Sequence, residues 1–160
     1  MPCWRPSPGI ASRTGVGPGT RARLVSAGPR YGVADLKTDL QVMYRKAGIK
    51  GEGITFLFTD QQVADERFLV FMNDLLSSGN IPGLFPVEEQ DDIVNSVRPA
   101  AKRSGLPDTR NACYDYFISQ VRQNLHCALC FSPIGEPIKI RTRRFPALLN
   151  CVVIDWFQPW

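Results

Sequence analysis

The chain has 160 residues, the usual length of one domain, and its hydrophobic fraction of 44% is that of an ordinary globular protein. No stretch approaches the ~18–20 apolar residues of a membrane helix. Residues 1–34 hold five arginines and no acid, whereas residues 35–160 hold the other 14 basic side chains and all 15 acidic ones. This balance argues against a nucleic-acid-binding body, and we expect no membrane partner either.

The first 34 residues differ from the rest in composition. They contain six glycines and five prolines, and a segment so poor in large apolar side chains cannot build a packed core. We therefore expect residues 1–34 to be a disordered tail, separate from a folded body over residues 35–160. The arginine content is that of a transit peptide, but the prolines and glycines would break its amphipathic helix, so a non-native leader is an alternative.

Apolar side chains in residues 35–160 recur at helical spacing in some segments and form short runs in others. They predict helices over residues 35–47, 65–77, 88–98, 109–123 and 146–150, and strands over Ile54–Thr59, Leu125–Phe131 and Cys151–Trp156. Pro99 interrupts the third helix, and Thr109 is a typical N-cap. Because apolar strands alternate with helices, the fold class is α/β, with a mostly parallel sheet flanked by helices.

An acidic residue directly follows the first predicted strand. Asp60 would lie at the carboxyl end of a parallel strand, where ligands bind and where a carboxylate holds the Mg²⁺ of a bound nucleotide. The next residue is Gln61, and glutamine can hydrogen-bond a water molecule but cannot take its proton. A helix-capping role for Asp60 is the alternative, because aspartate is also a favoured cap.

Two further polar features follow the second predicted strand. Ser132 could contact a γ-phosphate, although an ordinary loop serine explains it as well. Arg141, Arg143 and Arg144 are three arginines within four residues. Guanidinium groups match phosphoryl oxygens and could serve a phosphate across a subunit boundary. A solvated basic loop is the alternative.

The segment His126–Cys130 contains a Cys-x-x-Cys pair, which occurs in zinc and redox sites. Positions three apart in a strand face opposite sides, so small core side chains are the better explanation. The five cysteines are an odd number and no signal-peptide core follows Met1, so we expect reduced thiols and a cytosolic compartment. The sequence contains neither a P-loop pattern nor a Ser-His-Asp set, and a self-contained enzyme is not expected.

Residues 35–160 resemble the axonemal dynein heavy chains, and specifically the fourth AAA+ module of their motor ring. The resemblance is carried by a collinear set of segments, which are ITFLFTD at 54–60, NDLLSSGNIPGLF at 73–85, NLHCALCFSP at 124–133 and RFPALLNCVVIDWFQPW at 144–160. It implies a partial AAA+ large subdomain, which is P-loop NTPase-like, and it implies that the Walker A strand and loop and the lid are missing.

The resemblance also implies roles for single residues. Asp60 stands at the Walker B aspartate, which coordinates the Mg²⁺ of bound ATP. Gln61 stands where a hydrolysing module has glutamate, so we expect weak or no hydrolysis and assign no catalytic residue. Ser132 stands at the sensor-1 position. Arg141 and Arg144 are both candidates for the arginine finger that reaches the neighbouring module. Glu66 also matches a family position, where we expect a structural role.

At the level of the whole protein, the resemblance implies a fragment of an ATP-driven, minus-end-directed microtubule motor in the axoneme of cilia and flagella. ATP or ADP with Mg²⁺ would bind in the longer parent, without tight binding to the fragment. Expected partners are the neighbouring AAA+ modules, and, through the parent, dynein intermediate and light chains and microtubules. The alternative is a stand-alone small binding protein derived from such a module, without motor activity.

Overall fold

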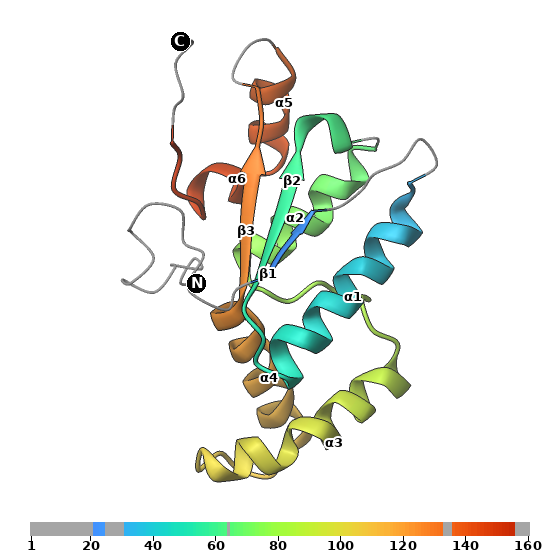
Figure 1. Cartoon of the computed structure of the whole chain (residues 1–160), viewed down its shortest axis with the longest axis vertical. Coiled ribbons are helices and arrows are strands. Elements are labelled where there is room, and N and C mark those ends of the chain that lie inside the picture. Colours follow the sequence, from blue (N-terminus) through green and yellow to red (C-terminus); the bar gives the residue numbers. More distant parts are fainter. Residues whose placement is uncertain (1–20, 25–30, 64, 133–135, 156–160) are drawn as a thin grey trace.

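The computed structural model describes residues 21–24, 31–63, 65–132 and 136–155 (Figure 1). Its sheet has three strands in the order β1-β2-β3, with β1 at Arg21–Leu24, β2 at Ile54–Thr59 and β3 at Leu125–Cys130. Both pairings are parallel, and the register places Thr59 beside Cys130. The carboxyl ends of β2 and β3 therefore lie at one edge of the sheet, as the α/β prediction requires.

Helices connect and flank the strands. Their bounds are α1 Val33–Ile49, α2 Arg67–Ser77, α3 Val87–Arg103, α4 Arg110–Asn124, α5 Glu136–Arg144 and α6 Ala147–Asn150, with a short 3₁₀ helix, η1, at Asp60–Gln62. In the described residues, no helix is long and apolar enough to cross a membrane.

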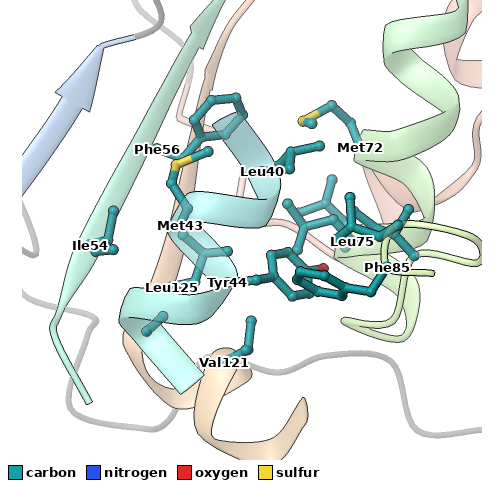
Figure 2. Close-up of a cluster of buried hydrophobic side chains, with 14 of the residues drawn as sticks. Leu40, Met43, Tyr44, Ile54, Phe56, Met72, Leu75, Phe85, Val121 and Leu125 are labelled. Atoms are coloured by element: carbon teal, nitrogen blue, oxygen red, sulfur yellow. The ribbon is translucent and has the colours of Figure 1, made fainter. Parts of the chain in front are cut away.

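The core lies between one face of the sheet and the helices (Figure 2). Alternate residues of β2, which are Ile54, Phe56 and Phe58, are buried, whereas those between them are only half-buried. Figure 2 shows side chains of α1 between the sheet and α2, with Tyr44 beside Phe85. Because the apolar side chains of α2 repeat every three to four residues, that helix presents one continuous stripe to this core.

Most of the predicted elements are confirmed. The strand over Ile54–Thr59 has the predicted bounds, and every residue of the predicted apolar stripe of α2 is buried. Thr109 caps α4, because its hydroxyl oxygen accepts a hydrogen bond from the backbone N–H of Ala112 at 3.3 Å. Local signals suffice for such elements because strand periodicity and cap chemistry are properties of short segments.

The prediction of a disordered tail through residue 34 is wrong for Arg21–Leu24, which form β1, and for Val33 and Ala34, which begin α1. The sequence of β1 is RARL, which contains no apolar run. Its order comes instead from backbone pairing with β2, which no composition rule can detect. Residues 1–20 and 25–30 lie outside the described residues.

Three further predictions are corrected near prolines and at the carboxyl end. Helix α3 continues through Pro99, because the buried residues Val97 and Ala101 hold it on both sides. Pro99 cannot donate a hydrogen bond to the carbonyl of Asn95, but Asn95 is exposed. The basic segment, for which a solvated loop was one of the two interpretations, forms helix α5, and Pro137 occupies its first turn. Cys151 and the next four residues form no strand, and Val153 is 79% exposed. The last residue of that predicted strand lies outside the described residues.

Candidate functional site

Asp60 lies directly beyond the carboxyl end of β2, as predicted, and begins η1. The backbone N–H of Thr59 donates to Gln62 Oε1 at 2.8 Å, so the second glutamine is used to close this turn. Gln61 is exposed. The turn therefore presents one carboxylate and one amide side chain in succession at the sheet edge, with the amide open to solvent.

The carboxylate of Asp60 is engaged by an arginine from a distant part of the chain. Arg141 Nη1 donates to Asp60 Oδ1 across 81 residues of sequence. The Arg141 side chain is only 17% exposed, and its guanidinium carbon lies 5.9 Å from the centre of the Phe131 ring. An aromatic face and a carboxylate together favour the charged guanidinium at this position.

A second arginine of α5 makes a parallel contact nearer the solvent. Arg144 Nη1 lies 2.5 Å from Glu66 Oε2, and both side chains are more than half exposed. Beside Glu66, Asp65 accepts hydrogen bonds from the backbone N–H and the Nε of Arg67, both at 2.8 Å. These bonds lower the pKa of the Asp65 carboxyl and tie down the start of α2.

Ser132 follows β3 in the way that Asp60 follows β2, and its side chain is exposed. Since β2 and β3 are parallel neighbours in register, both residues lie beyond the same edge of the sheet. Carboxylate, hydroxyl and amide oxygens are hard donors of the kind that Mg²⁺ prefers. Among the described residues, no three His, Cys, Asp or Glu side chains are grouped so that they could hold a metal ion.

The Cys-x-x-Cys pair lies in β3. Cys127 packs against the core and burial raises its pKa to about 12, whereas Cys130 is exposed at the strand end. Burial also lowers the pKa of His126. A thiol with so high a pKa remains protonated at neutral pH, which is the opposite of what a metal ligand or a redox nucleophile needs.

Sequence reasoning missed that the two arginines bind carboxylates of their own chain. Arg141 and Arg144, the two candidates for an arginine that reaches a neighbouring module, contact Asp60 and Glu66 here, and Figure 1 shows α5 beside the ends of β2 and β3. Their three-residue spacing was a signal, since such residues share one face of a helix. It could not be used without knowing that residues 136–144 are helical.

Comparison with known proteins identifies the family. The model of the P-loop containing dynein motor region D4 matches residues 21–160. The chain is 49% identical over 142 residues to the dynein alpha chain of the flagellar outer arm of Chlamydomonas reinhardtii, a match over 89% of this chain. It is 52% identical over 130 residues, 81% of this chain, to human dynein axonemal heavy chain 17.

In both cases the chain spans about 3% of the length of its relative. The family match begins at Arg21, in β1, and thus includes part of the segment that was expected to be unlike the family. Because this family match extends from residue 21 to residue 160, the chain belongs to the family of the P-loop containing dynein motor region D4.

Proposed function

We propose that this chain is the part of an axonemal dynein heavy chain that forms one face of the nucleotide site in the fourth AAA+ module of the motor ring. The whole protein would be a microtubule motor of the ciliary axoneme, in contact with intermediate and light chains. The names of its relatives, which are axonemal and flagellar heavy chains, support this assignment. The module would bind ATP with Mg²⁺ and regulate its neighbours through the packing between modules.

The observation that carries the proposal is the pair Asp60–Gln61 at the carboxyl end of β2. Asp60 supplies a carboxylate that would hold the Mg²⁺ of a nucleotide, and Ser132 at the neighbouring strand end would contact the γ-phosphate. Gln61 would hydrogen-bond the attacking water without accepting its proton. The module would therefore bind nucleotide and hydrolyse it slowly or not at all.

The two arginines of α5 would act beyond this module. Arg141 or Arg144 would reach the nucleotide of the preceding module, because guanidinium groups stabilise the charge that develops on a transferring phosphoryl group. Either role requires release from Asp60 or Glu66, since each arginine pairs within its own chain here.

The test needs a full-length heavy chain in which residues 21–160 replace the corresponding segment. Retention of radiolabelled ATP at this module is measured in single-turnover experiments. Asp60→Asn should lower retention by about tenfold or more, and Gln61→Glu should raise conversion to ADP at this module. Asp92→Asn, an exposed carboxylate of α3, is the matched control. Unchanged retention in Asp60→Asn would overturn the nucleotide-site assignment.

A further inference from the structure

Helix α5 is fixed to the segment between β2 and α2 at two points. Arg141 pairs with Asp60, and Arg144 Nη1 lies 2.5 Å from Glu66 Oε2. The two arginines are three residues apart, so they lie on the same face of the helix. Arg143 is exposed and makes no ion pair with another residue of the described part of the chain.

The two contacts differ in environment. The side chain of Arg141 is 17% exposed and is covered by the Phe131 ring, whereas that of Arg144 is 61% exposed. Exposed ion pairs are weak because water and salt screen them, and pairs withdrawn from water are screened less. Asp60 is 37% exposed, so the Arg141–Asp60 pair is partly withdrawn from water and is the less screened of the two contacts.

We propose that Arg141 is an internal counter-ion of Asp60 that competes with a divalent cation for this carboxylate, so that metal binding releases α5. The inference rests on the proposed function, in which Asp60 is the carboxylate that holds the metal. A guanidinium and a doubly charged cation on one carboxylate repel each other at short range, so they stabilise two alternative states. The cation binds the state in which Arg141 has left, and thereby shifts the population toward it.

The release has a consequence for both arginines. When Arg141 leaves Asp60, α5 keeps only the exposed pair of Arg144 with Glu66, which water and salt screen, so both guanidinium groups can exchange to phosphate on another surface. Coupling of this kind is reciprocal, so an anion that captures Arg141 would also raise the affinity of Asp60 for the cation. The occupancy of this site would thus control whether its arginines can serve the neighbouring one.

The experiment uses the ¹⁵N-labelled 160-residue chain and Mn²⁺ alone as the probe. Paramagnetic broadening of the backbone amide signals around Asp60 gives the dissociation constant. Arg141→Gln should bind Mn²⁺ about fivefold more tightly, the factor expected for a pair of this strength. Arg143→Gln removes the same charge from the same helix and should stay within about twofold of the wild type. Equal tightening in both variants, or none in Arg141→Gln, would overturn the proposal.

Asp60→Asn separates this inference from the proposed function. Broadening that persists in Asp60→Asn would overturn the role of Asp60 as metal carboxylate, and the inference with it. If Asp60→Asn loses the broadening while Arg141→Gln and the wild type bind Mn²⁺ with the same dissociation constant, only the competition between Arg141 and the cation is overturned. A wild-type measurement does not depend on how the variants fold. The Nη1–H protons of Arg141, which donate to Asp60, should exchange with water several-fold faster at saturating Mg²⁺, and unchanged exchange contradicts the release.

Discussion

Helices α1 and α4 cross so closely at Gly48 that the contact leaves no room for a side chain. A Cβ atom built on Gly48 would lie 2.3 Å from Phe117 Cε2, 2.5 Å from Phe117 Cδ2 and 2.9 Å from Val121 Cγ2. Carbon atoms in contact normally lie about 3.5–4.0 Å apart, so the overlap with the ring exceeds about 1 Å. Phe117 is fully buried and packs against Tyr44 and Phe85, so its ring cannot swing into solvent.

Gly48→Ala should therefore destabilise the chain although alanine is the better helix former. Overpacking of a core costs about 1–3 kcal/mol, and exchange of a mid-helix glycine for alanine returns about 0.5–1 kcal/mol. Gly48 is next to the last residue of α1, so it receives at most this gain. The net loss is about 1 kcal/mol at the centre of these ranges, which corresponds to a fall in Tm of about 2–4 °C for a chain of this size.

Urea unfolding followed by far-UV circular dichroism measures the free energy of unfolding of the wild type and of three variants. These are Gly48→Ala, Phe117→Leu and the double variant. Phe117→Leu should cost about 1 kcal/mol on its own and should make room for the new methyl group. The double variant should then be more stable than the sum of the two single losses by about 1 kcal/mol or more. Strict additivity, or a gain in stability for Gly48→Ala, would refute the steric argument.

Three further predictions concern the cap, a buried tyrosine and the cysteines. Thr109→Ala should lower the free energy of unfolding of the chain by about 1 kcal/mol in urea titrations, while Thr109→Ser, which keeps the capping oxygen, should not. Tyr44→Phe should cost about 1–3 kcal/mol, because the hydroxyl of Tyr44 donates to the carbonyl of Gly79 at 2.8 Å in the core. Burial raises the pKa of Tyr44 well above its usual value, so above about pH 10 only the unfolded chain loses this proton. Stability should fall there in the wild type and fall less in the variant; equal falls in both would contradict this. Burial also raises the pKa of Cys127 to about 12, so iodoacetamide at pH 8 should label the exposed Cys130 before Cys127, as peptide mass spectrometry would show. Faster labelling of Cys127 than of Cys130 would contradict its raised pKa.

The sequence was sufficient where a local pattern and a buried face agree. The run Ile54–Thr59 is apolar, contains aromatic and β-branched residues and is bounded by a glycine and an aspartate, so its bounds and the place of Asp60 followed from the residues alone. Helix α2 and the cap at Thr109 were likewise predicted from local patterns. Asp60, Gln61 and Ser132 were placed at one sheet edge because parallel strands end together.

The sequence was insufficient where order depends on distant partners. Strand β1 is ordered by backbone pairing with β2, and helix α5 is highly charged, with few apolar side chains to form a stripe. Its contacts to Asp60 and Glu66 span 81 and 78 residues, so no window of sequence contains both partners. The basic segment was therefore correctly marked for its arginines, but neither its helical form nor its internal carboxylate partners could be derived.

The means by which α5 is attached bears on what it can do. Helices α1 to α4 are fixed by buried apolar side chains, whereas the described side chains of α5, residues 139–144, include none of the buried core. Apolar burial is insensitive to charge, but ion pairs weaken with salt and exchange with competing ions. Within the described part of the chain, α5 is thus the only element attached mainly through charges. It is also the element that contacts Asp60, the candidate metal carboxylate. An element with this attachment can change its position in response to a cation while the sheet and its core remain unchanged.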